Sequence, residues 1–289
     1  RNSSFDSARF SQLDDERRAA IAEEESLQAK RNALSKEIGK LMGQGKKDEA
    51  EEIKAQVTQI NEQLSEATAR RAAADAGLKE ILMSTPNMPH PTTPIGKDEN
   101  DNPEVRRWGT PREFDFEAKA HWDLGPELGI MDFERGVKLA GSRFYVLGGQ
   151  GARLERALIN FMADTHTSRG MKEWWVPAVA NAETLTGTAQ LPKFEEDLFK
   201  TTDGMYLIPT AEVQLTNLHR DEVLDASKLP LKYCAFTPCF RSEAGAAGRD
   251  TRGIIRVHQF SKVEMVKFSK PEESQDDLEA MVNDAEYIL

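Results

Sequence analysis

The chain has 289 residues, a length that favours two domains over one. Its formal net charge of -11 argues against a uniformly basic nucleic-acid-binding surface, and 39 % hydrophobic residues are enough for a sizeable core. No apolar run of about 18 residues is present, so no membrane-spanning helix is predicted. Only two cysteines occur, which excludes a disulfide framework and favours a reducing compartment, for which we expect the cytoplasm.

The stretch from about Leu13 to Met83 has the heptad spacing of a coiled coil. Apolar residues recur there at alternating steps of three and four, interrupted at Glu24, Arg31 and Arg71. The glycine-containing segment 43–48 separates two such seams. Two seams joined by a tight turn can bury themselves only against each other, so we predict an antiparallel helical hairpin whose second helix is about 55 Å long.

Local charge qualifies the acidic total. The segment between Gln28 and Lys47 contains six basic residues and only one acidic residue, Glu37. The first helix is therefore expected to carry a basic patch towards the tip of the hairpin, including Lys30, Arg31, Lys36 and Lys40.

Four prolines between Pro86 and Pro94 end the helical pattern and predict a stiff linker. We divide the chain into a hairpin at 1–85, a linker at 86–105 and a core at 106–289. The core shows short apolar runs typical of an α+β domain built on antiparallel strands. The elements expected there are strands at 143–147, 174–179, 232–241 and 254–268, a helix from about 150 to 168 and a helix at 271–289.

The last two strands carry the chemistry. Alternate residues of a strand share a face, so Arg241 and Glu243 are expected to point together. On the returning strand the shared face holds Arg256, His258, Phe260, Lys262 and Glu264. Such a face suits a polar, partly planar ligand, although the alternation alone also fits a solvent-facing sheet with ordinary cross-strand ion pairs.

An aminoacyl-adenylate matches that face in length. Phe260 and Glu264 lie about 13 Å apart along a strand. Phe260 can stack on an adenine while Arg256 covers its other face, and Glu243 can accept the adenine amino group. Arg241 suits the α-phosphate. His258 is interpreted as structural.

The segment FRSEAGAAGRDTRGIIRVHQFSKVEM, starting at Phe240, resembles motif 2 of class II aminoacyl-tRNA synthetases in its seryl version. The segment starting at Gly141 and ending in WWVPAV resembles motif 1, and GTAQLPKFEEDLF and LIPTAEVQLTNLH are also similar to seryl-tRNA synthetases. The resemblance implies ATP-dependent activation of L-serine, transfer of serine to tRNA(Ser), and charging of tRNA(Sec) with serine where that tRNA is present.

The resemblance also implies roles for individual residues. The serine site would comprise Thr210, Ala211, Glu212 and Glu264, and the ATP site Arg241, Ser242, Glu243, Arg256, Val257 and Phe260. Taken alone, Thr210 also fits a helix N-cap followed by a first-turn acid. Mg²⁺ is expected to arrive with ATP rather than in a protein metal site.

Further partners follow from the same resemblance. The hairpin would bind tRNA through Lys30, Arg31, Lys36 and Lys40, and the loop of motif 2 would add Arg249 and Arg252. Pro177 would lie at a homodimer interface. The family's motif 3 is not found before Leu289, so the active site is expected to be incomplete within this chain. The rival interpretations are a paralogue that loads a carrier protein and a non-catalytic coiled-coil interaction protein.

Overall fold

The computed structural model describes residues 5–244 and 252–289. It divides into two compact units, Arg1–Gly109 and Thr110–Leu289. Each unit has its own interior, and we describe them separately.

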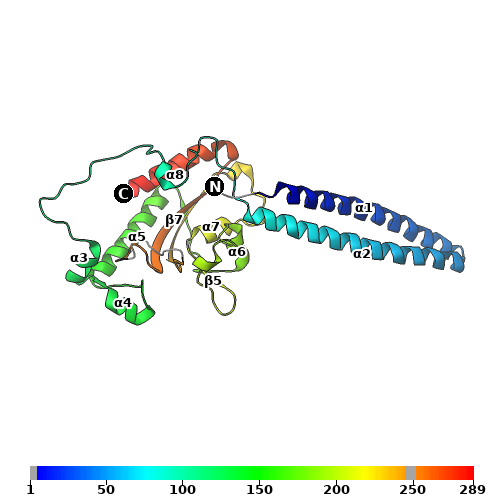
Figure 1. Ribbon diagram of the computed structural model, residues 1–289, viewed down its shortest axis with the longest axis horizontal. Coiled ribbons are helices and arrows are strands. Elements are labelled where there is room, and N and C mark those ends of the chain that lie inside the picture. Colours follow the sequence, from blue (N-terminus) through cyan, green and yellow to red (C-terminus); the bar gives the residue numbers. More distant parts are fainter. Residues whose placement is uncertain (1–4, 245–251) are drawn as a thin grey trace. The chain divides into compact units, whose positions relative to one another are not determined.

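The first unit is built on an antiparallel pair of long helices, α1 (Ser7–Gly43) and α2 (Lys47–Ser84), which lie side by side along their length (Figure 1). The predicted hairpin is therefore confirmed. Its seam buries mainly small and branched side chains, namely Leu13, Ala20, Leu27, Ala50, Ala67, Ala74 and Leu78. Two of the polar interruptions meet across the seam, because Arg71 Nη1 donates to Glu24 Oε2 at 3.1 Å.

The turn between the helices needs a glycine. Gly45 has a φ of 76°, a left-handed conformation that glycine adopts without a Cβ penalty. The amides of Gly45 and Lys46 donate to the carbonyls of Met42 and Leu41, which are left free at the end of α1. This pair of hydrogen bonds caps the C-terminus of α1, and the chain reverses direction there.

In its described residues, the second unit combines short helices with three small sheets. The helices are α3 (His121–Glu127), α4 (Phe133–Ala140), α5 (Gln150–Ser168), α6 (Ala182–Gly187), α7 (Glu212–Asn217) and α8 (Ser274–Ile288). The strands are β1 (Met131–Asp132), β2 (Val146–Leu147), β3 (Lys172–Glu173), β4 (Val179–Ala180), β5 (Tyr206–Leu207), β6 (Leu231–Phe240) and β7 (Gln259–Phe268). Short 3₁₀ helices occupy Glu99–Asp101 in the first unit and Glu195–Asp197, Ala226–Lys228 and Pro271–Glu273 in the second.

Strands β6 and β7 form the long antiparallel pair that the sequence predicts. Their register runs from Leu231 opposite Phe268 to Phe240 opposite Gln259. Strand β3 adds to the other edge of β6 in parallel, and β1–β2 and β4–β5 are antiparallel. The α+β class, dominated by antiparallel pairing, is therefore confirmed.

The two faces of β7 have different neighbours. Ser261 bonds to Glu155 on α5, whereas Lys262 bonds to Thr210 just before α7. Adjacent residues of a strand point to opposite faces, so α5 and the start of α7 lie on opposite sides of β7 (Figure 1). The buried residues Val176, Ala211, Leu215, Tyr233 and Ala235 form the core cluster next to α7.

Three predicted strands are shorter or displaced. Of the strand expected at 143–147, only β2 (Val146–Leu147) forms. No strand covers 174–178, where Pro177 lacks the amide that a ladder needs, and pairing resumes only at Val179. Strand β7 begins at Gln259 rather than at residue 254. Gly253 is left-handed, and the Ile254 amide donates to His121 Nε2 at 2.9 Å instead of to β6.

Candidate functional site

One cleft of the second unit collects five of the ten residues that were assigned to serine or ATP. It has a volume of about 510 Å³ and lies on the α7 side of β6 and β7. Its lining residues are Gln190, Phe194, Asp197, Leu198, Pro209, Thr210, Glu212, Arg241, Glu243, Arg256 and Lys262. A volume of this order is in the range of small-molecule sites.

At one end of the cleft a hydrogen-bond network surrounds the Thr210 hydroxyl. This hydroxyl donates to Glu264 Oε2 at 2.5 Å and accepts from Lys262 Nζ at 3.0 Å. Lys262 also forms an ion pair with the same carboxylate oxygen. Thr210 is 5 % exposed and the Glu264 side chain 16 %, so the network is largely withdrawn from water. A carboxylate held in this way is a suitable acceptor for a ligand ammonium or hydroxyl group.

Thr210 also shapes the start of α7. Its hydroxyl accepts the Glu212 amide at 3.2 Å, so the capping role suggested by the residue type coexists with the bond to Glu264. Glu212 is the first residue of α7 and its side chain lines the cleft. Ala211 is fully buried in the core cluster and contributes packing rather than a polar contact.

The other end of the cleft carries two guanidinium groups. The Arg241 guanidinium carbon lies 5.1 Å from the centroid of the Phe260 ring. Arg256 Nη1 donates to Glu243 Oε2 at 3.2 Å, and this ion pair is half-buried at Arg256 and largely buried at Glu243. Arg256, which we expected to cover the far face of an adenine stacked on Phe260, is paired here with Glu243, and Arg241 is the guanidinium that lies near the Phe260 ring.

Three residues assigned to the ATP site, Ser242, Val257 and Phe260, do not line this cleft. The Ser242 hydroxyl donates to the Glu196 carbonyl, and its amide donates to the Asp197 carbonyl at 3.0 Å. Val257 is 7 % exposed and faces an apolar hollow beside α5. Ser242 thus ties the end of β6 to the 3₁₀ turn at Glu195–Asp197.

His258 pairs with Arg241 one position beyond the regular pairing of β6 and β7. Its Nδ1–H donates to the Arg241 carbonyl at 2.9 Å, and its own carbonyl accepts the Arg241 amide at 3.0 Å. The ring also contacts Phe144 and Phe199, with centroid distances of 5.3 and 5.7 Å. These contacts tie the end of β6 to the start of β7, which fits a structural histidine.

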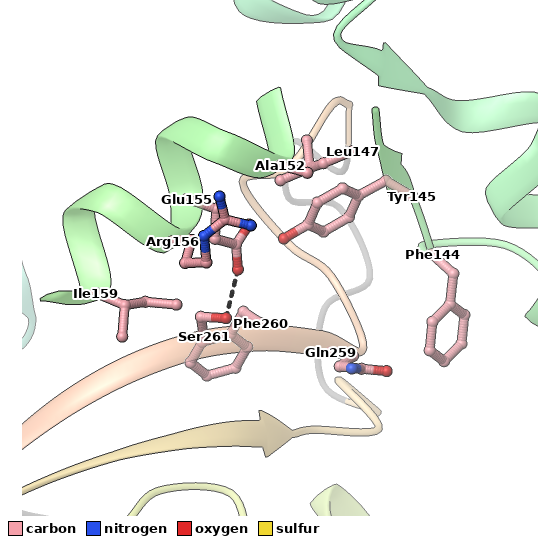
Figure 2. A pocket seen from close by; sticks show the side chains of 10 residues that line it. All are labelled: Phe144, Tyr145, Leu147, Ala152, Glu155, Arg156, Ile159, Gln259, Phe260 and Ser261. Carbon is pink, nitrogen blue, oxygen red and sulfur yellow. Dashed lines mark hydrogen bonds between the residues drawn. The ribbon is translucent and has the colours of Figure 1, made fainter. Parts of the chain in front are cut away.

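A second cavity of about 350 Å³ lies between α5 and β7 (Figure 2). Figure 2 shows Glu155 and Ser261 pointing towards each other, and Phe260 on the strand beside them. Burial, together with the nearby Glu155 charge, raises the pKa of Tyr145, which lines the same cavity. Phe260 therefore lines this cavity and also contacts Arg241, which lines the first cleft.

Several cleft residues were not assigned a role from the sequence. They are Gln190, Phe194, Asp197, Leu198 and Pro209, together with Lys262, which was placed on the correct face without a function. Gln190 Oε1 is buried without a hydrogen-bond partner among the described residues. Apart from Lys262, which lies on β7, these residues lie in irregular segments, turns or a short 3₁₀ helix, where neither strand nor helix periodicity predicts which side chains face the cleft.

The residues assigned to tRNA binding fall in different places. Lys30, Lys36 and Lys40 are exposed on α1 and Arg31 is half-buried. The Arg252 guanidinium lies 4.4 Å from the Trp122 ring centroid. Arg249 lies outside the described residues. Pro177, assigned to a dimer interface, is exposed, and its carbonyl accepts Gln214 Nε2 at 2.7 Å.

Within 5–244 and 252–289, no group of three or more His, Cys, Asp or Glu side chains is arranged to hold a metal ion. In those same ranges, no helix has the length and apolar character needed to cross a bilayer.

Comparisons with known proteins identify the family. Residues 1–89 match the seryl-tRNA synthetase N-terminal domain, and 193–289 match the class II tRNA synthetase core domain of the G, H, P, S and T enzymes. A serine–tRNA ligase from Neisseria meningitidis serogroup C is 54 % identical over 293 residues, covering 99 % of this chain and 68 % of the relative. The chain belongs to the seryl-tRNA synthetase family.

Two further comparisons support this family assignment. A serine–tRNA ligase from Pelobacter propionicus is 51 % identical over 282 residues, which cover 97 % of this chain. The crystal structure of seryl-tRNA synthetase from Pyrococcus horikoshii complexed with ATP matches with a TM-score of 0.85 and 36 % identity, covering 96 % of this chain and 67 % of that one. This chain spans about 66 % of the length of the Pelobacter seryl-tRNA synthetase.

Proposed function

We propose that the protein carrying this chain activates L-serine with ATP to seryl-adenylate and transfers the serine to tRNA(Ser). The observation that carries this proposal is one cleft, lined by Thr210, Arg241 and Glu243, on a seryl-tRNA synthetase fold, with Glu264 hydrogen-bonded to Thr210. ATP is also the ligand named for the Pyrococcus horikoshii structure.

The proposed first step needs no general base, because the serine carboxylate is already ionised at neutral pH. One carboxylate oxygen attacks the α-phosphorus of ATP, a phosphorus–oxygen bond forms, and pyrophosphate leaves with its electron pair. Arg241 is positioned to neutralise the charge that grows on the α-phosphate oxygens. In the second step a ribose hydroxyl at the end of the tRNA attacks the serine carbonyl carbon, and AMP leaves.

Selection of serine is assigned to the Thr210 end of the cleft. Glu212 and Glu264 supply two carboxylates, one for the ammonium and one that can also accept the serine hydroxyl. Alanine lacks that hydroxyl and would leave a buried acceptor unpaired, which is costly. Threonine is excluded by the space that its additional methyl group would need.

The nucleotide is assigned to the other end. Phe260 and Arg241 offer an aromatic face and a planar cation for the adenine and phosphates, and Glu243 can accept the adenine amino group. Mg²⁺ is expected to arrive with ATP, since it binds largely through phosphate oxygens with one or two carboxylates.

The proposed partners are tRNA(Ser), bound by the exposed basic residues of α1, and a second copy of the protein. A homodimer interface is favoured by the apolar face of α5, where Leu154, Leu158 and Phe161 are 57 %, 48 % and 47 % exposed. We extend the tRNA proposal to tRNA(Sec) where that tRNA is present, and we propose a cytoplasmic location.

Amino-acid-dependent exchange of pyrophosphate into ATP tests the activation step on the full-length protein. Exchange should require serine and stay near background with alanine or threonine. Exchange driven equally well by alanine would contradict the selection that we assign to Thr210 and Glu264.

A further inference from the structure

Arg143, between α4 and β2, hydrogen-bonds to the residues that flank β6 and β7 but does not line the cleft. Its Nη1 donates to the Glu243 carbonyl at 3.3 Å, and its own carbonyl accepts the His258 amide at 3.1 Å. Glu243 follows β6 and His258 precedes β7. A single residue from outside motif 2 therefore links the exit of one strand to the entry of the other.

The backbone conformation of this contact is unusual. Arg143 has a φ of 62° and Glu243 a φ of 51°. They are two of four non-glycine residues in the described ranges with left-handed backbones, and they are bonded to each other. Non-glycine residues in this conformation cost free energy and concentrate at functional sites. The contact thus holds Glu243 in a conformation that its residue type does not favour.

Arg143 is itself well anchored. The next residue, Phe144, packs its ring 5.3 Å from the His258 ring, and β2 pairs with β1 just beyond it. The Arg143 carbonyl accepts the His258 amide. The Arg241 carbonyl therefore accepts from the His258 imidazole Nδ1 instead of from that amide. Displacing Arg143 would therefore disturb the backbone next to both Arg241 and Glu243.

We propose that Arg143 is a positioning residue for the nucleotide end of the cleft. By bonding to the Glu243 carbonyl, it fixes the left-handed backbone that directs the Glu243 carboxylate into the cleft beside Arg256. The inference rests on the proposed function, in which this carboxylate accepts the adenine amino group. It concerns a segment, Gly141–Gly149, that lies outside the two stretches matched by the family models.

The left-handed backbone at Arg143 suggests variants that remove the guanidinium without adding backbone strain. Asparagine tolerates this conformation and glycine adopts it freely, so Arg143→Asn and Arg143→Gly should fold. Arg143→Lys keeps a cationic donor and serves as the conservative rescue. Arg135→Asn, which removes an exposed arginine paired with Asp132, is the matched control.

The measurement is serine-dependent pyrophosphate exchange by the full-length protein with ATP and with purine riboside triphosphate, which lacks the 6-amino group. For Arg143→Asn and Arg143→Gly we expect the KM for ATP to rise about tenfold and the KM for serine to change less than about twofold. The KM for the analogue should hardly change, so the preference for ATP shrinks. Arg143→Lys should recover most of that preference, and melting temperatures should stay within about 3 °C of wild type.

Two results would overturn the inference alone. An unchanged KM for ATP in an active Arg143→Asn protein would show that Arg143 does not position the nucleotide site. Equal losses for ATP and the analogue, with a lowered melting temperature, would show a purely structural role. A wild-type protein without serine-dependent exchange would instead contradict the proposed function, and the inference would fail with it.

Discussion

The Thr210 hydroxyl donates to Glu264 Oε2 at 2.5 Å and thereby joins the start of α7 to the middle of β7. The two residues are 54 positions apart in the sequence. Lys262 contacts both of them, so the hydroxyl, the carboxylate and the ammonium form one partly buried network. This network is the part of the cleft that we assign to serine, and the first prediction tests it.

Glu264→Ala should raise the KM for serine strongly and leave the KM for ATP nearly unchanged. Loss of a buried charged partner costs about 1.5–3 kcal/mol, which corresponds to roughly 10- to 150-fold. Pyrophosphate exchange at varied serine and varied ATP measures both constants. Glu272→Ala, at an exposed position, is the control. Wild-type constants for both substrates would remove Glu264 from the serine site.

The basic residues of α1 should act on tRNA alone. Replacing Lys30, Arg31, Lys36 and Lys40 with Ala should weaken tRNA(Ser) binding and flatten its salt dependence, since each lost phosphate contact reduces the slope of log K against log salt by about 0.7–0.9. Serine-dependent pyrophosphate exchange involves no tRNA and should be unchanged. Lys79→Ala, an exposed lysine near the other end of α2, is the control.

The quadruple variant also separates recognition from a structural role of the hairpin. If the four charges are merely solvated, the variant should charge tRNA(Ser) at the wild-type rate at every salt concentration. That outcome would remove α1 from our account of tRNA binding.

The two cysteines should resist alkylation in the folded protein. Cys234 and Cys239 are both fully buried, and burial raises the pKa of Cys234 to about 11 and that of Cys239 in the same direction. Little thiolate therefore forms at pH 8, and reagents have no access to it. Peptide mass spectrometry after iodoacetamide treatment should show neither Cys234 nor Cys239 labelled in buffer and both labelled in guanidinium chloride. Rapid labelling in buffer would contradict the burial of β6.

The free energy of unfolding should fall as the pH drops from 7 to 5, because His166 takes up a proton more readily in the unfolded chain than in the folded one. This histidine is 3 % exposed, its Nδ1 has no hydrogen-bond partner in the described ranges, and burial lowers its pKa. Asp284 opposes this shift and Arg169 adds to it. The unfolded chain takes up the proton near the ordinary histidine pKa, so stability is present above that value and is lost as the pH falls below it.

Urea unfolding at pH 7 and pH 5 measures this dependence. His166→Gln should reduce the difference between the two free energies of unfolding, whereas His90→Gln, at an exposed position, should leave it unchanged. An unaltered pH dependence in His166→Gln would show that another group is responsible.

The sequence predicts the hairpin well because a heptad seam has one way to bury itself, and Glu24 and Arg71 even compensate each other's interruptions. The shared face of β7 is equally predictable from local sequence, because alternation alone places Lys262 and Glu264 on one side of the strand. What alternation does not give is which partner each side chain meets. The ring contact of Arg241 with Phe260, and the ion pair of Arg256 with Glu243, depend on how the strand ends bend.

The contributions from outside motif 2 were also beyond sequence reasoning. Gln190 faces the cleft from an irregular segment, and Arg143 reaches Glu243 across 100 positions of sequence. No periodicity marks a residue whose role is to donate to a distant backbone carbonyl. Only the tertiary fold brings these segments to the ends of β6 and β7.

Transfer of radiolabelled serine to tRNA(Ser) by the full-length protein tests the central claim most directly. The account predicts ATP-dependent formation of a base-labile ester on tRNA(Ser), with little label incorporated from alanine or threonine. It also separates the proposal from a relative that activates serine for another acceptor. Serine-dependent pyrophosphate exchange without any transfer of serine to tRNA(Ser) would contradict it.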